Sequence, residues 1–351
     1  MSRNCVVVCD QWLGSNGYAG ARALRRAGWS VEVVPEREYV PTHWRTLRLR
    51  VVGRLLRPFA IREFGSALEH AADTLRPDFV LVFKGTFTPA SALQGLKRRG
   101  VKTYCFYPDN SIFAHGPIIP AALPVYDWVF SAKTFGLRDM QSTLGVTRAS
   151  LLLHGFDPDT HAPCTLDSGS HETYACEASF IGTWSPKKQR YLSHLVRIRP
   201  NLRLRVWGAQ WERVSRKDSL YPFLMHRGVT GKEYAEAICA SSVNIAILSE
   251  RRSGASADDQ ITSRTFHIPA CGAFMLHERT GEVLEQFEDG VHIGTFGSPE
   301  ELVAGVDRYL GDQNARVRCA AEAHRLVLAR DSWDARVQTI LDKHRELSVG
   351  D

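Results

Sequence analysis

The stretch Phe180-Ile-Gly-Thr-Trp-Ser-Pro-Lys-Lys-Gln-Arg190 predicts a strand that ends at Gly182, a polar turn and the start of a helix. Short β-branched runs alternate with helical patterns on both sides of this stretch. Such alternation is typical of βαβ units on a parallel sheet. The first turns of the predicted helix carry Lys187, Lys188 and Arg190, although a helix dipole favours carboxylates at that end. A bound diphosphate would compensate for these charges, and a solvated helix start is the plainer alternative.

The alternating pattern occurs twice along the 351 residues, once over residues 5–153 and again over residues 178–295. Between the two runs, Gly155–Ser170 is rich in Pro, Asp and Gly, which predicts an interdomain linker. We therefore predict two Rossmann-like α/β domains, residues 1–156 and residues 157–351, the second ending in helices. Ligands of such domains bind at the carboxyl ends of the strands, so two facing domains would enclose a cleft.

The composition excludes several classes of protein. With 44% hydrophobic and 23% charged residues, the chain is neither disordered nor fibrous. No apolar run is long enough to span a bilayer, and the start of the chain lacks a signal-peptide core, so we expect a cytoplasmic location. The eight cysteines form no CxxC pair and the thirteen histidines no HxxxH pair, which predicts reduced, buried thiols and no metal site.

Charge is distributed unevenly along the chain. Residues 1–156 carry 20 basic and 11 acidic side chains, whereas the remainder carries 24 and 27. This asymmetry suggests that the first domain faces an anionic partner, although a merely solubilising surface explains it equally well.

A second polar cluster lies in Asp258–Leu276, which predicts a loop, a short helix, a turn at Gly272 and a buried strand. Ser263, Arg264 and Thr265 at the helix start offer hydrogen-bond donors to an anion. The Arg264 guanidinium is suited to bidentate contacts with phosphate oxygens.

In this order, the two segments resemble the CgeB-like glycosyltransferases, whose catalytic domain belongs to the group-one glycosyltransferases. The resemblance spans most of the chain. Its motifs are Val80–Lys84, Tyr107–Asn110, Tyr126–Phe130, His154–Pro158, Phe180–Gly182, Ser263–Phe266, Ala270–Gly272 and Pro299–Leu302. It implies a GT-B fold of two Rossmann-like domains, a nucleotide-sugar donor in the C-terminal one, no metal or other cofactor, and retention of anomeric configuration.

One position departs from the group-one pattern. There, an acidic residue near the transferred sugar is followed eight positions later by a glutamate that holds the donor ribose. This sequence has Asp259 and His267 at those positions. The resemblance leaves Asp259 an electrostatic, catalytic role, and His267 could still hydrogen-bond a hydroxyl group. Alternatively, His267 is a half-buried helix residue.

On the donor side, this reading assigns nucleotide-sugar binding to residues of the two clusters. They are Gly182, Thr183, Lys187, Lys188, Arg190, Ser263, Arg264, Thr265 and His267.

In the first domain, the segment Asp10–Gly17 lies between a strand and a helix, where backbone amides hold an anion or polar group, although a tight turn explains it too. Tyr107-Pro-Asp-Asn110 ends another strand, and we assign Asp109 to orienting the acceptor hydroxyl. Alternatively, Asp109 only caps the following turn. The predicted acceptor-side residues are Gly14, Asn16, Gly17, Lys84 and Asn110.

The segment His43–Arg62 contains six arginines and no acidic residue, interleaved with large apolar side chains. Such a basic amphipathic stretch, here Arg45–Arg62, can lie on an anionic membrane surface, which would make the protein peripheral at the inner membrane face. It could also guide a charged acceptor, whereas no recognition motif supports nucleic-acid binding. A docked helix with a solvated arginine face is the structural alternative.

These observations predict a metal-independent glycosyltransferase that moves a sugar from a nucleotide diphosphate sugar to a glycan, a lipid-linked or another anionic acceptor. The alternative is a non-catalytic protein that binds nucleotide sugars or polysaccharides during envelope or coat assembly. The altered position at His267 favours that alternative.

Overall fold

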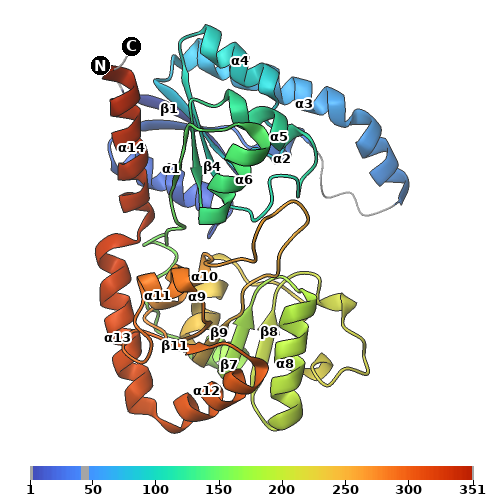
Figure 1. The fold of residues 1–351 in the computed structure, drawn as a ribbon, viewed down its shortest axis with the longest axis vertical. Coiled ribbons are helices and arrows are strands. Elements are labelled where there is room, and N and C mark those ends of the chain that lie inside the picture. The colour runs from blue at the N-terminus through green and yellow to red at the C-terminus, as the bar shows by residue number, and fades with distance from the viewer. Residues whose placement is uncertain (1–2, 41–46, 350–351) are drawn as a thin grey trace. The chain divides into compact units, whose positions relative to one another are not determined.

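The computed structural model describes residues 3–40 and 47–349, which form two compact α/β units (Figure 1). Unit 1 contains the described residues up to His154, together with Arg251–Ala257 and the described residues from Arg336 onward. Unit 2 contains Gly155–Glu250 and Asp258–Ala335. Each unit has its own sheet and its own hydrophobic core.

Unit 1 is built on a parallel sheet with the strand order β2-β1-β3-β4-β5-β6. Its central strands are fully buried, because helices cover both faces of such a sheet. The strands are β1 (Asn4–Val8), β2 (Ser30–Val33), β3 (Phe79–Phe83), β4 (Lys102–Tyr107), β5 (Trp128–Ser131) and β6 (Ala149–Leu151). The helices are α1 (Asn16–Arg26), α2 (Glu36–Tyr39), α3 (Leu47–Leu75), α4 (Ala90–Arg98), α5 (Ile118–Ala122), the short η1 (Leu123–Val125) and α6 (Thr134–Leu144).

Unit 2 is built on a second parallel sheet, with the order β11-β10-β9-β7-β8. The strands are β7 (Cys176–Ile181), β8 (Leu204–Trp207), β9 (Ser241–Ala246), β10 (Met275–Glu278) and β11 (Gly294–Phe296). The helices are α7 (Ser168–Tyr174), α8 (Pro186–Ile198), η2 (Trp211–Arg213), η3 (Tyr221–Phe223), α9 (Gly231–Cys239), α10 (Arg264–Ala270), α11 (Gly281–Gln286), α12 (Pro299–Gly311) and α13 (Gln313–Arg330). A last helix, α14 (Trp333–Val349), begins in unit 2 and continues in unit 1.

The order of the strands reverses once in each sheet, between β1 and β3 in unit 1 and between β7 and β9 in unit 2. At such a point the loops after neighbouring strands diverge and leave room for a ligand. The structure therefore offers one candidate binding position in each unit, at the carboxyl ends of these strands.

The division at His154 lies two residues before the predicted boundary, but two segments differ from the prediction. Arg251–Ala257 belongs to unit 1, where the Ser111 hydroxyl donates a hydrogen bond to the carbonyl of Ser253 at 2.6 Å. The C-terminal part of α14 also belongs to unit 1, because the His344 ring packs against Phe79, with the ring centroids 4.9 Å apart.

The predicted linker Gly155–Ser170 is also different in the structure, since its first half packs within unit 2. Phe156 and His161 are buried, and the Asp157 carboxylate accepts hydrogen bonds from the Asp159 amide and the Thr160 hydroxyl. Asp, Pro and Gly therefore mark a folded turn here. Among the described helices, none is both long and apolar enough to cross a bilayer.

Candidate functional site

Arg264, the first residue of α10, lies where the strand order of unit 2 reverses. Its Nη2 atom donates a hydrogen bond to the carbonyl of Ile247, just past β9, at 2.8 Å. Its guanidinium carbon lies 5.3 Å from the ring centroid of Phe180 in β7. The buried Nε atom has no hydrogen-bond partner among the described residues. Arg264 thus places a positive charge, with one buried donor atom left unpaired, at the edge of the sheet where a ligand is expected.

The position of Arg264 depends on the absence of a side chain at Gly182. A Cβ atom there would lie 2.7 Å from Nη1 of Arg264 and 3.0 Å from the Phe180 ring. Burial lowers the pKa of Arg264, and the charges of Tyr234 and Asp259 oppose that shift. An arginine nevertheless keeps its charge in proteins, so the site is cationic.

Lys188 holds together the loops that follow β7 and β9. Its Nζ atom donates hydrogen bonds to the carbonyl of Thr183 at 3.1 Å and to the Ser249 hydroxyl at 2.9 Å. The residue is only 4% exposed. Lys188 therefore positions the backbone around the site, and Thr183, whose side chain is exposed, contributes its carbonyl to that contact.

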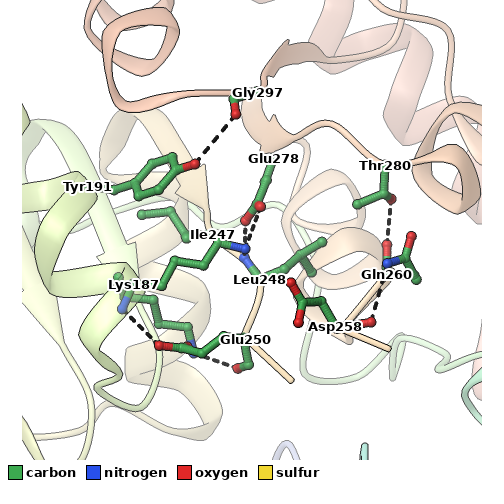
Figure 2. A network of polar contacts seen from close by, with 12 residues as sticks. Lys187, Tyr191, Ile247, Leu248, Glu250, Asp258, Gln260, Glu278, Thr280 and Gly297 are labelled. Atoms are coloured by element: carbon green, nitrogen blue, oxygen red, sulfur yellow. Dashed lines mark hydrogen bonds and ion pairs between the residues drawn. The ribbon is translucent and has the colours of Figure 1, made fainter. Parts of the chain in front are cut away.

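Lys187 forms an ion pair within the protein, as Figure 2 shows. Its Nζ atom lies 2.5 Å from Oε1 of Glu278, whose Oε2 accepts a hydrogen bond from the Leu248 amide at 2.9 Å. The backbone amide of Lys187 donates to Oε1 of Glu250 at 2.9 Å. Glu278 therefore compensates the charge of Lys187 within the protein, and the predicted contact of the α8 cations with a diphosphate stays a prediction.

Arg190 lies in a different environment. It is exposed, and its guanidinium carbon lies 5.7 Å from the Tyr191 ring centroid. It lines a shallow groove of about 530 Å³ on the surface of α8, together with Trp184, Arg197 and Asp218. The Asp218 carboxylate accepts hydrogen bonds from Gln189 and Ser193, which fixes the groove wall. No contact recorded among the described residues joins Arg190 to Arg264.

The remaining residues around α10 divide into two kinds. Ser263 is half-buried at the helix start, and its side chain makes no cap hydrogen bond. Asp259 is buried near Arg264, and its amide donates to the carbonyl of Ser249 at 3.1 Å. By contrast, the Thr265 hydroxyl is fully buried 2.9 Å from Nε2 of His277, so its predicted donor contact is not available to a ligand.

His267 lies in a buried aromatic cluster. Its ring stacks on His161, with the centroids 3.8 Å apart and the planes inclined by 14°, and meets Tyr234 edge-on. Its Nε2 atom lies 3.3 Å from the carbonyl of Gly155. Burial and the nearby His161 hold the pKa of His267 well below its usual value, so the ring is neutral. His267 is thus a buried, packed residue of α10 and not the half-buried one of the alternative, and its contact with a donor hydroxyl stays a prediction.

In unit 1, three charged or titratable groups meet after β3 and β4. The Asp109 Oδ2 atom lies 2.9 Å from Nζ of Lys84 and 2.6 Å from Nε2 of His115. Burial opposes ionisation of Asp109, but the hydrogen bond from His115 and the charge of Lys84 outweigh it and hold the pKa of Asp109 well below its usual value. Lys84 has a φ angle of 71°, a strained conformation for a side-chain-bearing residue that is typical of functional sites.

The glycine-bearing loop of unit 1 combines a turn, a polar contact and a packing contact. Gly14 has a φ angle of 93°, and Asn16 Nδ2 lies 3.2 Å from Nδ1 of His154. A Cβ atom at Gly17 would lie 2.2 Å from Cβ of Cys9, so Gly17 lets α1 approach β1. Asn110 is half-buried beside Asp109 in sequence.

The sequence analysis assigned no site role to several residues of these clusters: His115, His161, Glu250, Glu278 and His154, which it quoted only within a motif. Glu278 is the last residue of β10, the strand that follows the predicted turn at Gly272. An acidic residue at the carboxyl end of a predicted strand could have been identified from the sequence as a candidate site residue. His115 follows a loop of no regular pattern, so only the folded chain brings it to Asp109. The described residues contain no group of three or more His, Cys, Asp or Glu side chains placed to hold a metal ion.

Residues 187–342 match a family described as glycosyl transferase-like. No curated protein sequence matches the chain significantly. Its fold is similar to that of sucrose-phosphate synthase from Thermosynechococcus elongatus, with a TM-score of 0.70 and 11% identity over 99% of this chain and 100% of the other. The fold is also similar to that of a glycosyltransferase from Rickettsia africae, with a TM-score of 0.68 and 11% sequence identity over 98% of each chain.

A third similar structure is HepE from Anabaena in complex with UDP-glucose, with a TM-score of 0.65 and 12% identity over 97% of this chain and 99% of the other. The architecture, two parallel sheets with alternating helices, is the GT-B architecture of these glycosyltransferases. The predicted fold class, an α/β GT-B fold with two Rossmann-like domains, is therefore confirmed.

We predict that Lys84→Met raises the pKa of Asp109 toward its usual value, because the carboxylate loses its cationic partner. Carboxyl NMR titration measures this shift. A carboxyl group whose pKa is lowered in the folded state stabilises that state at neutral pH, and this stabilisation is lost as the pH falls through the titration range of Asp. The variant lacks this contribution, so its free energy of unfolding should decrease less on acidification than that of the wild type.

Lys97→Met is the matched control, because Lys97 pairs with Asp127, 3.1 Å away, and not with Asp109. If Asp109 titrates at the same pH in wild type and in Lys84→Met, the ion pair does not exist in solution.

Proposed function

We propose that this protein is a glycosyltransferase that uses a nucleotide diphosphate sugar bound to unit 2. The observation that carries the proposal is Arg264, a half-buried cation with an unused Nε donor at the reversal of strand order. This residue lies inside the segment that matches the glycosyl transferase-like family. HepE, a protein of similar fold, binds UDP and UDP-glucose, which supports the donor class.

In the proposed reaction, the bond between the anomeric carbon and the diphosphate breaks, and a bond to the acceptor oxygen forms. Negative charge develops on the departing diphosphate. Arg264 would stabilise that charge, because a fixed cation in a partly dry site needs no reorganisation during the reaction. Asp259 would act electrostatically near the transferred sugar. Metal independence and retention of configuration are part of this proposal and rest on the family resemblance.

On the acceptor side, we assign Asp109 to orienting the acceptor hydroxyl. Its ionised state, maintained by Lys84 and His115, supports this role, because a carboxylate accepts the hydroxyl hydrogen bond. The acceptor class remains a glycan or a lipid-linked molecule. We also keep the narrower CgeB-like affiliation as part of the proposal, on the strength of its ordered motifs.

A non-catalytic nucleotide-sugar or polysaccharide-binding protein is the second candidate, and one observation favours it. His267 is buried and hydrogen-bonded inside unit 2, so the group that would hold the donor ribose in the group-one pattern is missing. Slow hydrolysis of the donor to free sugar separates the two candidates, because a transferase without acceptor transfers to water.

We predict that Arg264→Ala weakens binding of UDP by about ten- to a hundredfold, since a charge-assisted hydrogen bond contributes on the order of 1.5–3 kcal/mol. Gly182→Ala should weaken binding in the same direction, because its Cβ atom displaces the Arg264 guanidinium. Calorimetric titration with UDP and other nucleoside diphosphates measures both.

Gly281→Ala is the matched control, because a Cβ atom there meets no atom within 4 Å. Unchanged affinity in both site variants would remove Arg264 from the donor site. Binding without any donor hydrolysis would instead favour the non-catalytic candidate.

We predict that Asp109→Asn lowers the rate of sugar transfer by on the order of a hundredfold while UDP affinity is unchanged, because shape is kept and charge is lost. Transfer assays with a panel of acceptors, alongside calorimetry, measure the two effects. Asp127→Asn serves as the control, since that carboxylate hydrogen-bonds Thr103 at the opposite end of β4. Full activity of Asp109→Asn, or a parallel loss of UDP binding, would contradict the assignment.

A membrane-bound acceptor is consistent with the first half of α3. The predicted segment begins outside the described residues, at His43 and Arg45, but its later part is described. Five large apolar side chains are exposed along one helical stretch, namely Val51, Val52, Leu55, Leu56 and Phe59. Arg54, Arg57 and Arg62 are exposed among them.

The second half of the same helix shows the contrast, because Phe64, Leu68 and Ala72 are buried in the core of unit 1. Figure 1 shows the first half of α3 extending beyond the sheet of its own unit. An exposed apolar surface flanked by arginines matches an anionic lipid surface in both hydrophobicity and charge. We therefore assign this part of α3 to peripheral binding of anionic membranes.

We predict that the double variant Leu55→Ser, Phe59→Ser binds anionic vesicles more weakly than the wild type. Arg54→Gln should weaken binding by about fivefold, because each basic residue near an anionic membrane contributes roughly 1 kcal/mol. Sedimentation with phosphatidylserine and with phosphatidylcholine vesicles measures the difference. Val317→Ser, Leu328→Ser removes two similarly exposed apolar residues of α13 and should have no effect. If the wild type binds both vesicle types equally, or binds neither, α3 does not bind anionic membranes and is only a helix docked on unit 1.

A further inference from the structure

Glu36, the first residue of α2, is a buried acidic side chain that bonds a loop of unit 1. It is 8% exposed. Its Oε1 atom accepts a hydrogen bond from the Phe87 amide at 3.1 Å and another from the Thr88 hydroxyl at 2.6 Å. Thr88 is itself fully buried. Glu36 therefore fixes the end of the loop that joins β3 to α4.

The same loop begins with two residues in the left-handed region of backbone conformation. Lys84 has a φ angle of 71° and Gly85 one of 73°. The Lys84 amide donates a hydrogen bond to the carbonyl of Phe106 in β4 at 2.8 Å, which fixes the start of the loop. A residue with a side chain keeps such a conformation only where its surroundings impose it. The contacts at the two ends of the loop therefore hold Lys84 in this conformation.

The backbone of Lys84 in turn decides where its ammonium group lies. The Nζ atom is 2.9 Å from Oδ2 of Asp109, and its charge contributes to the lowered pKa of that carboxyl group. A continuous series of contacts thus leads from Glu36 along the loop to Lys84 and on to Asp109.

A carboxyl group is an expensive choice at the position of Glu36. Burial raises the pKa of Glu36 to about 6, although the hydrogen bonds from Thr88 and Phe87 lower it, and the charge of Asp10 raises it further. The group also lies near the thiol of Cys105 and the phenol of Tyr126, which are buried as well. A side chain that only filled this space would be more stable if it were apolar. What the carboxylate adds is a strong acceptor for the two donors of the loop.

We propose that Glu36 is a positioning residue of unit 1, which holds the loop after β3 in the conformation that places Lys84 against Asp109. Glu36 acts through the backbone of the loop and the Thr88 hydroxyl. Its effect on sugar transfer rests on the proposed function, in which Asp109 orients the acceptor hydroxyl, whereas the position of Lys84 is measured without any substrate.

The first test follows the titration of Asp109 by carboxyl NMR in the protein without ligand. Glu36→Ala removes the acceptor of the loop, so the pKa of Asp109 should rise part of the way toward its usual value. Glu36→Gln keeps a carbonyl oxygen for the same two donors, so Asp109 should titrate as in the wild type. This rescue separates the hydrogen bonds to the loop from the charge of Glu36.

Thr88→Val is a milder variant, because it removes only one of the two hydrogen bonds to Glu36. The pKa of Asp109 should rise by a smaller amount than in Glu36→Ala. The pKa of Glu36 itself should rise further above its value of about 6, since the Thr88 hydroxyl lowers it. If Glu36→Ala does not fold, this variant decides the question, and an unchanged titration of Asp109 would then overturn the proposal.

The second test measures sugar transfer and binding of UDP. Glu36→Ala should lower kcat by up to about a hundredfold, because a small displacement of a group that orients a substrate has effects of that order. The affinity for UDP should not change, and Glu36→Gln should restore most of the rate. Thermal unfolding of each variant identifies any loss of the fold.

Glu38→Ala is the matched control, because Glu38 lies on the same helix and is exposed. It should change neither the titration of Asp109 nor the rate. An unchanged titration of Asp109 in Glu36→Ala, or a Glu36→Gln protein that behaves like Glu36→Ala, would overturn the proposal. If the titrations follow the expected order but the wild type transfers no sugar, the positioning role is supported and the proposed function is wrong.

Discussion

Two backbone segments meet where β7 and β8 end, and no residue larger than glycine fits at their closest approach. A Cβ atom at Gly208, which has a φ angle of 137°, would lie 2.0 Å from the carbonyl oxygen of Gly182. That oxygen instead accepts a hydrogen bond from the Trp211 indole at 2.9 Å, and the Gly182 amide donates to the carbonyl of Trp207. The turn after β7 is thereby fixed, which sets the start of α8 and leaves the space that Arg264 fills.

The charges around this turn follow from the same constraint. Once α8 begins beside the ends of β9 and β10, the cations in its first turn lie next to the protein's own acceptors. Glu278 pairs with Lys187, and Lys188 is satisfied by a carbonyl and a hydroxyl. The unfavourable helix dipole is thus compensated within the fold. Arg264 differs from both lysines, because its buried Nε donor has no hydrogen-bond partner among the described residues.

Local pattern predicted the fold well, because parallel strands and their helices have strong periodic signals. The two predicted runs, residues 5–153 and 178–295, agree within two residues with the strands and helices from Asn4 to Leu151 and from Cys176 to Phe296. What the pattern could not predict was contact between distant segments. The return of α14 to unit 1 rests on packing of His344, and the polar cluster at Asp109 needs His115, which no periodic signal marks. Sequence identified which residues carry charge, whereas only the fold decides which of them are already paired.

His267 illustrates why a single substitution changes the chemistry of a site without changing the fold. A glutamate at this position would place a carboxylate against His161 and Tyr234, where desolvation is costly without a partner. A neutral imidazole instead stacks on His161 and hydrogen-bonds the carbonyl of Gly155, which holds the start of unit 2 against α10. The side chain at this position therefore contributes packing within unit 2, and its Nε2 atom lies within reach of a carbonyl group of the protein itself.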